Sequence, residues 1–180
     1  MPDVLTSSPL VLRRWDVADV AAVVSAIQLS IEDLSAWIPW FVGGVPTVES
    51  ERAVFEAGAA EFDRDGDWAY SMFEMTTAEL VGSCALHPRD DGSILEIGYW
   101  VRSDRHGRGY ATVAARCLTE AAFRFVASAE RVVIRMDRAN VGSARVPAKL
   151  GYVLDGEESR ERLASGHTGR GLVWSMSRPN

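Results

Sequence analysis

Residues 94–137 constrain the fold more than any other part of the chain. An apolar stretch, Ile94 to Val101, leads into the glycine-rich turn His106 to Ala111, which a helical pattern and the apolar run Arg131 to Asp137 follow. This order predicts strand, turn, helix and strand. Because a long helix separates the two strands, the second strand must return parallel to the first. The turn opens the helix, so unpaired backbone N–H groups and the positive end of the helix dipole converge there and predict an anion site.

Two common phosphate-binding motifs do not fit this turn. The dinucleotide pattern G-x-G-x-x-G fails because Thr112 stands where its last glycine belongs, and no acidic ribose ligand follows on a strand about 20 residues later. The nucleoside triphosphate loop that ends in Gly-Lys-Ser/Thr is also absent. The segment from Arg102 to Arg108 carries three arginines against one aspartate. This local positive charge favours a phosphate ligand over a merely solvated loop.

The remaining patterns predict an antiparallel framework around this unit. A first strand is expected at Val11 to Trp15, then a helix that Asp16 caps and that runs to about Ser30, and a second helix at Val48 to Arg64. Further strands are expected as a hairpin at 68–75 and 80–87 and as a closing antiparallel pair at 152–154 and 172–176. The expected fold is α/β (α+β), one domain over residues 1–180 with a mixed, largely antiparallel sheet of about six to seven strands and helices on both faces.

Two helices carry expectations about individual side chains. In the helix after the glycine turn, four apolar residues recur at every fourth position and are expected to face the core: Val113, Cys117, Ala121 and Phe125. In the next helix, Pro147 would remove a backbone hydrogen bond and clash with the Ser143 carbonyl if the helix ran on from Val141, at a cost of about 3 kcal/mol. We therefore expect Ser143 to be the N-cap, which places the proline in or just past the tolerated first turn.

Composition and charge restrict the class of protein. The 180 residues carry a formal net charge of −6 and are 47% hydrophobic, and no apolar run approaches the ~18 residues that cross a bilayer. The N-terminus lacks a secretion signal, so we expect a cytoplasmic protein without a membrane partner. The negative charge disfavours a nucleic-acid partner. Cys84 and Cys117 lack metal-ligand spacing, so we expect two reduced core thiols and no metal site.

The turn and its surroundings resemble the acyl-CoA-binding region of the GCN5-related N-acetyltransferase (GNAT) superfamily. The superfamily turn reads [Gln/Arg]-x-x-Gly-x-[Gly/Ala]. Here Gly109 and Ala111 occupy the last two fixed positions, and His106 replaces the usual Gln or Arg. Segments on both sides resemble the RimJ/RimL-like branch, so the resemblance covers nearly the whole chain: LRRW at 12–15, WIPW at 37–40, EIGYWV at 96–101, NVGS at 140–143 and KLGY at 149–152.

The resemblance implies acetyl-CoA as the cofactor and a particular place for it. In the superfamily, the strand before the glycine turn and the parallel strand after its helix splay apart, and the thioester lies in the gap. The cofactor arm would pair with the backbone of Tyr99, Trp100 and Val101, and the pyrophosphate would bind at the turn formed by His106, Gly107, Arg108, Gly109, Tyr110 and Ala111. Asn140 matches the superfamily asparagine that contacts the cofactor arm. A turn-forming asparagine is the alternative.

Three residues are candidates for the chemistry. Ser143 lies where many relatives place a tyrosine or serine that hydrogen-bonds the leaving thiolate, although a hydroxyl that caps a helix cannot easily do both. Glu96 is the candidate base because it lies on the central strand beside the expected thioester; pairing with an arginine across the sheet is the alternative. Glu158, in an acidic cluster with Glu157 that would attract a cationic amine, is a second candidate base. Plain surface solvation is the alternative for that cluster.

The acceptor amine decides how much a base matters. An α-amine with a pKa of about 7.7–8 is partly neutral at pH 7, whereas a lysine amine with a pKa near ~10.4 is almost wholly charged. Positioning should therefore dominate for an α-amine, and proton removal matters far more for lysine.

Trp37 and Trp40 are expected either to line the acceptor pocket or to pack in the core or an interface.

The leading hypothesis is an N-acetyltransferase that moves an acetyl group from acetyl-CoA to a primary amine by direct attack in a ternary complex. The acceptor is a protein N-terminal α-amine or a small-molecule amine. The alternatives are a non-catalytic acyl-CoA-binding sensor and an acyltransferase that uses another acyl-CoA, such as succinyl-CoA. Exposed strand edges and the aromatic segment at 37–41 permit a homodimer without requiring one.

Overall fold

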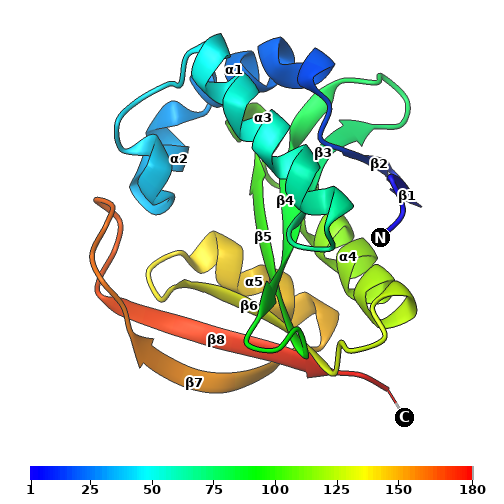
Figure 1. The fold of residues 1–180 in the computed structure, drawn as a ribbon. Coiled ribbons are helices and arrows are strands. Elements are labelled where there is room, and N and C mark those ends of the chain that lie inside the picture. The colour runs from blue at the N-terminus through cyan, green and yellow to red at the C-terminus, as the bar shows by residue number, and fades with distance from the viewer. Residues whose placement is uncertain (180) are drawn as a thin grey trace.

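A computed structural model describes residues 1–179 and contains one eight-stranded sheet in the order β1-β2-β3-β4-β5-β6-β8-β7 (Figure 1). Every neighbouring pair in it is antiparallel except β5 and β6, which are parallel as expected. The strands are β1 Val4–Ser7, β2 Leu10–Arg14, β3 Trp68–Glu74, β4 Leu80–Arg89, β5 Ile94–Val101, β6 Arg131–Asp137, β7 Val153–Ser159 and β8 Arg170–Ser177. The α-helices are α1 Val20–Gln28, α2 Ile31–Trp37, α3 Val48–Asp63, α4 Tyr110–Phe125 and α5 Val141–Leu150.

The predicted mixed, largely antiparallel sheet is confirmed, with one more strand than expected. The extra strand is β1, four residues that pair with β2 so that Leu5 lies opposite Leu12. Its brevity hid it, because four residues carry too little alternation to be distinguished from a loop. The closing pair β7 and β8 is also longer than predicted, since the exposed Glu157 and the half-buried Glu158 belong to β7.

The segment from 16 to 37 contains two α-helices where one was predicted. The Asp16 side chain accepts from Ala18 N at 2.9 Å and caps a short 3-10 turn that leads into α1. The chain then breaks at Ser30, whose φ of −124° is not helical, and resumes as α2. The buried Ser30 hydroxyl accepts from Ser103 N at 3.0 Å. This bond ties the break to the segment just before the glycine turn and so fixes where α2 lies.

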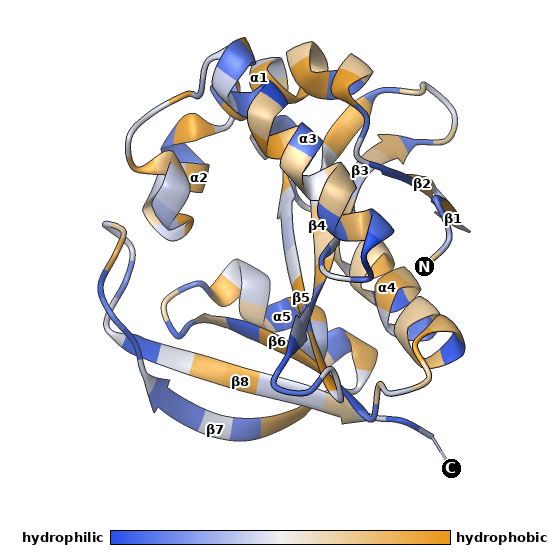
Figure 2. Cartoon of the chain, viewed as in Figure 1, coloured by the Kyte–Doolittle hydropathy of each residue, from blue (hydrophilic) through white to orange (hydrophobic). Residues whose placement is uncertain are grey.

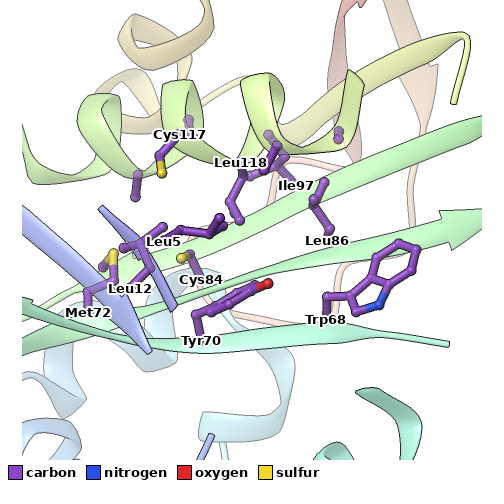
Figure 3. Close-up of a cluster of buried hydrophobic side chains, with 14 of the residues drawn as sticks. Leu5, Leu12, Trp68, Tyr70, Met72, Cys84, Leu86, Ile97, Cys117 and Leu118 are labelled. Atoms are coloured by element: carbon purple, nitrogen blue, oxygen red, sulfur yellow. The ribbon is translucent and has the colours of Figure 1, made fainter. Parts of the chain in front are cut away.

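Helices cover both faces of the sheet, as predicted. One core lies between the sheet and helices α4 and α5, and Figure 3 shows Cys117 and Leu118 of α4 pointing at the strands there. The other core packs α1, α2 and α3 against the opposite face. Cys84 and Cys117 are free and buried, which confirms the prediction of two core thiols. Burial raises the pKa of Cys117 to about 11.

The inward face of α4 differs by one residue from the prediction. Cys117 and Ala121 are buried, but Phe125 is 46% exposed. The guanidinium of Arg124 lies over its ring, 5.1 Å from the centroid. A repeat of four residues drifts around a helix that has about 3.6 residues per turn, so the fourth position of the series has rotated toward solvent. Ala114, Leu118 and Ala122 are fully buried and form the centre of the face.

Helix α5 begins earlier than predicted, and the expectation that Ser143 is its N-cap is wrong. Asn140 is the N-cap, and its Oδ1 accepts from Ser143 N at 3.0 Å. The helix runs on from Val141, and Pro147 lies inside it. The side-chain hydroxyl of Ser143 is therefore not used as a cap.

The two parallel strands separate soon after they meet. β5 and β6 pair only from Ile94 opposite Arg131 to Glu96 opposite Val133, while β4 pairs with β5 as far as Val101. The rest of β5, residues 97–101, therefore has no strand partner on its β6 side within the described chain. This divergence confirms the expected splay and opens a space at the start of α4 and α5. No helix in the described residues has the length and apolarity to cross a membrane.

Candidate functional site

A cavity of about 600 Å³ lies where β5 and β6 separate. Five structural units line it: the end of β5, the glycine turn, the start of α4, one face of α5 and one face of α2. The lining residues are Asp33, Leu34, Trp37, Ile38, Tyr99, Trp100, Val101, Arg105, His106, Gly107, Gly109, Tyr110, Ala111, Thr112, Ala139, Asn140, Val141, Gly142, Ser143, Arg145, Val146 and Lys149. Most residues expected to bind the cofactor are therefore brought together.

The glycine turn presents its backbone donors as expected. Gly107 and Gly109 have φ values of +77° and +82°, and a Cβ on either would meet nothing within 4 Å. The positive φ favours glycine at both positions. Because no atom of the described chain lies near the Cβ position of either glycine, the space beside this backbone is open to a ligand. Within residues 1–179, the N–H groups of residues 107–111 donate to no backbone or side-chain acceptor. They are free for an anion at the start of the sixteen-residue helix α4.

His106, in the position of the usual Gln or Arg, has a clear local role. Its Nε2 lies 3.0 Å from the carbonyl of Val101, and a carbonyl only accepts, so Nε2 carries a hydrogen. The ring thus ties the turn to the last residue of β5 and sets the spacing between strand and turn. The neighbouring side chains are placed differently: Arg108 is exposed and does not line the cavity, and the buried Tyr110 donates to Glu74.

Asn140 and Ser143 stand opposite β5 across the cavity. Asn140 Oδ1 caps the helix by accepting from Ser143 N, so this oxygen has the local structural role considered as the alternative. The side-chain NH2 group of Asn140 is left to donate to a ligand. The Tyr99 hydroxyl lies 2.9 Å from Ser143 Oγ and donates to the Ser143 carbonyl at 3.2 Å. Burial raises the pKa of Tyr99 to about 12. A neutral, fixed pair of hydroxyls therefore lines the wall near the end of β5.

The three predicted carboxylates lie outside the cavity. Glu96 is held by Arg89 at 3.0 Å and by Arg135 at 2.9 Å, which is the arginine pairing considered as the alternative to a base. Glu158 lies 3.7 Å from the same Arg135. Glu157 pairs with Arg170 at 3.0 Å. Glu96 lies on β5, whereas Glu157 and Glu158 lie near the end of β7, where Figure 2 shows hydrophilic colouring. Base roles for Glu96 and Glu158 stay predictions.

The two predicted tryptophans separate. Trp37 lines the cavity, whereas Trp40 is 75% exposed and lies outside the lining. Trp37 is held by the loop between β7 and β8, which reaches α2 in Figure 1: His167 Nε2 donates to the Trp37 carbonyl at 2.9 Å, and Gly166 N donates to the Ala36 carbonyl at 2.9 Å. The Gly166 position has no room for a Cβ, which would lie 2.6 Å from that carbonyl.

The same loop is also fastened to the end of β6. Both carboxylate oxygens of Asp137 accept from Thr168, at 2.8 Å from its N–H and 2.9 Å from its hydroxyl, and Oδ1 also accepts from Ala139 N at 2.9 Å. Burial acts to raise the pKa of Asp137, but the hydrogen bonds from Ala139 and Thr168 outweigh it and lower the pKa. The loop thus connects α2 with the strand that precedes Asn140.

Several lining residues were not singled out from the sequence. Asp33 of α2 is the one carboxylate among the lining residues in the described chain, and Arg105, Arg145 and Lys149 are the lining cations. Arg105 pairs with Glu79. The available signal was helical spacing, because Asp33 and Trp37, like Arg145 and Lys149, are four residues apart and share a helix face. That spacing alone does not indicate which face meets a cavity.

The charge of the lining suits a long anionic ligand. The lining contains three cations and the free N–H groups of the turn, but one carboxylate of the described chain, and Leu34, Trp37 and Val146 add apolar surface. The phosphates of acetyl-CoA match the donors, and the arm matches the open edge of β5. In the described residues, no cluster of His, Cys, Asp and Glu could hold a metal ion.

Comparisons with known proteins agree with this geometry. The sequence matches the family model described as "Acetyltransferase (GNAT) domain" over residues 9–153. Among solved structures, the ribosomal L7/L12 alpha-N-protein acetyltransferase RimL, in complex with coenzyme A, has a TM-score of 0.87 at 19% identity over 97% of each chain. RimJ of Mycobacterium smegmatis, in complex with a CoA disulfide, has a TM-score of 0.85 at 23% identity, covering 98% of this chain and 88% of that one. A search of curated protein sequences returned no match.

Proposed function

Because the chain belongs to the GNAT acetyltransferase family, we propose that it transfers an acetyl group from acetyl-CoA to a primary amine. The observation that carries the proposal is the row of free N–H groups at residues 107–111, beside the open edge of β5 and two cations of α5. The pyrophosphate is bound by the turn, and the arm lies along Tyr99, Trp100 and Val101. Arg145 and Lys149 attract the remaining phosphate charge.

The lining residues suit direct attack without a covalent enzyme intermediate. In the reaction, a C–N bond forms, the C–S bond breaks, the electron pair leaves on sulfur, and the amine loses a proton. We assign to Ser143 the hydrogen bond to the developing thiolate, because Asn140 caps α5 and the Ser143 hydroxyl, among the described residues, is hydrogen-bonded only to the hydroxyl of Tyr99, which also lines the cavity. Both cysteines are buried in the core with no lining position, which supports attack by the acceptor itself.

An acceptor with an α-amine fits the site best. The two candidate bases, Glu96 and Glu158, are paired with arginines outside the cavity, so either would act only through water. An α-amine needs the least help, since about a tenth of it is neutral at pH 7. Asp33 would attract the amine to the cavity. RimL and RimJ share the fold, and RimL is a ribosomal L7/L12 alpha-N-protein acetyltransferase, which supports a protein N-terminus over a small amine.

A non-catalytic acyl-CoA sensor is the second candidate. This candidate is favoured because both candidate bases, Glu96 and Glu158, are held in ion pairs outside the cavity. Among the described residues, Asp33 is the one carboxylate that lines it. A different acyl group, such as succinyl, is tested in the same experiment.

The two buried thiols suit a reducing compartment and support cytoplasmic residence. The exposed Trp40 and Val42 offer apolar surface for a homodimer.

The experiment is a thiol-release assay with purified protein. Acetyl-CoA or succinyl-CoA is mixed with a peptide that has a free N-terminus, a lysine peptide with a blocked N-terminus, or a polyamine. We expect acetyl-CoA and the free N-terminal peptide to turn over fastest. Binding of acetyl-CoA in calorimetry without thiol release from any acceptor would favour the sensor.

The base is tested in the same assay with Glu96→Gln. If Glu96 removes the proton, turnover falls much more for the lysine peptide than for the α-amine peptide, because lysine is almost wholly charged at neutral pH. Glu157→Gln is the control, since Glu157 is also an ion-paired carboxylate outside the cavity. Equal losses with both acceptors would remove Glu96 from the base role.

A further inference from the structure

Pro147 leaves one carbonyl of α5 without its helical donor. The proline lies inside the helix, and it has no N–H to donate to the carbonyl four residues back, which is that of Ser143. A buried carbonyl without a partner costs about as much as a lost hydrogen bond. The Tyr99 hydroxyl fills this place, donating to the Ser143 carbonyl at 3.2 Å. The proline and the tyrosine are therefore complementary, although 48 positions of sequence and a change of element separate them.

The same hydroxyl contacts the side chain of the same serine. Tyr99 Oη lies 2.9 Å from Ser143 Oγ, and both residues line the cavity. A tyrosine has one proton and a carbonyl can only accept, so all three oxygens are satisfied when Tyr99 donates to the carbonyl and Ser143 donates to Tyr99. Because burial raises the pKa of Tyr99 to about 12, its hydroxyl keeps its proton at neutral pH.

We infer that Tyr99 is a positioning residue for Ser143. The Tyr99 hydroxyl donates its proton to the Ser143 carbonyl because Pro147 leaves that carbonyl without a helical donor. Ser143 Oγ is then held at the cavity wall with its own proton resting on Tyr99. When negative charge develops on the leaving sulfur, that O–H turns toward it, and no covalent bond of Ser143 or Tyr99 changes. This last step rests on the proposed function, whereas the coupling among the three residues does not.

The chain offers a matched control for a buried tyrosine hydroxyl. Tyr152 Oη lies 2.6 Å from Thr119 Oγ1, again a hydroxyl on a helix, and burial raises its pKa to about 12 as well. Tyr152 does not line the cavity. Replacing either tyrosine by phenylalanine removes one buried hydroxyl, but only Tyr99→Phe removes a hydroxyl that is hydrogen-bonded to Ser143.

The coupling is tested by stability alone, through chemical denaturation of four proteins: unsubstituted, Tyr99→Phe, Pro147→Ala and the double variant. Tyr99→Phe should lower the folding equilibrium constant about tenfold, because the Ser143 carbonyl loses its partner. In the Pro147→Ala background the same change should cost about twofold, since the substituted helix position supplies an N–H. Equal losses in the two backgrounds would overturn the coupling.

The positioning is tested by kinetics with the N-terminal peptide. Tyr99→Phe should lower kcat about tenfold while KM for acetyl-CoA stays within about twofold, and Tyr152→Phe should leave both within about twofold. Adding Tyr99→Phe to Ser143→Ala should lower kcat no further, because the hydroxyl that Tyr99 positions is gone. Equal kcat for the two tyrosine variants would overturn the positioning role. If the unsubstituted protein turns over no acceptor, the proposed function fails, and the stability cycle still decides the coupling.

Discussion

The two walls of the cavity are built in different ways. The cofactor wall comes from one continuous stretch, from the end of β5 through the glycine turn into α4, and its donors are backbone N–H groups. The proposed acceptor wall is one face of α2, which the loop between β7 and β8 holds in place through contacts such as His167 to Trp37 across 130 positions of sequence. The first wall therefore depends on local backbone conformation, and the second depends on contacts between residues that are far apart in sequence.

The sharpest test of the backbone wall is Gly109→Trp. A side chain here requires a strained positive φ and blocks the approach of an anion to the free N–H groups. We expect the Kd for acetyl-CoA to rise at least ~100-fold in calorimetry. Gly151→Trp is the control, because Gly151 has a φ of +80° with equally open space but lies outside the cavity lining. Unchanged affinity in Gly109→Trp would refute the phosphate assignment.

The acceptor wall is tested by Asp137→Asn, which replaces an oxygen facing the Thr168 N–H or hydroxyl by a donor. We expect a loss of about 1–3 kcal/mol in the free energy of unfolding at pH 7, with acetyl-CoA affinity retained. The folded-state pKa of Asp137 is lowered, so its stabilisation is present above the unfolded pKa of about 3.9 and is lost as pH falls through the folded pKa.

Denaturation between pH 7 and pH 3 checks the Asp137 prediction. The unsubstituted protein should lose more stability over this range than Asp137→Asn, which has no carboxylate to protonate at this position. Asp91→Asn serves as the control, because Asp91 also caps a backbone N–H, that of Ser93 at 3.0 Å, far from the acceptor wall. A fall in acetyl-CoA affinity in Asp137→Asn as large as the fall in stability would mean that the two walls are not independent.

A smaller effect is expected from the cations of the cofactor side. Replacing Arg145 and Lys149 together by alanine should weaken acetyl-CoA binding roughly tenfold at low salt, and less at high salt, because exposed charges are screened. Arg116→Ala on α4 is the control, as it is exposed and outside the lining. Repeating the titration with dephospho-CoA shows which phosphate the pair attracts. An affinity independent of salt in both proteins would exclude this role.

The smallest effect is expected from Asp33→Asn. Removing the lining carboxylate should raise KM for the cationic N-terminal peptide about threefold, while KM for acetyl-CoA stays the same. The adjacent Glu32→Gln changes the same charge on an exposed residue outside the lining. If both variants behave alike, the effect is general charge and not a contact in the cavity.

Much of the cofactor side could be predicted from sequence because its causes are local. The bounds of β5 and β6 matched the prediction, and the turn between them was recognised from Gly107 and Gly109, whose φ values are positive in the structure. The family resemblance carried the assignment of Asn140. The N-cap was misassigned because Pro147 argued against a helix from Val141, and the compensating hydroxyl of Tyr99 lies on another element.

The acceptor side was less accessible. The polarity of Glu96 indicated either a base or an ion pair, and only the pairing of β5 with β6 brings Arg135 within 2.9 Å of it. Trp37 and Trp40 look alike in sequence, yet the end of α2 turns one into the cavity and the other to solvent. Asp33 carried no signal beyond its helical spacing.

By itself, the order of residues determined the strand, glycine turn and helix that present backbone donors, because turn geometry and helix ends depend on neighbours in the chain. Tertiary structure alone decided which carboxylate reaches the cavity, which hydroxyl replaces the hydrogen bond that Pro147 removes from α5, and where α2 lies. Those outcomes depend on the distance between side chains from separate elements, which exists only once the sheet has paired and the helices have packed on it.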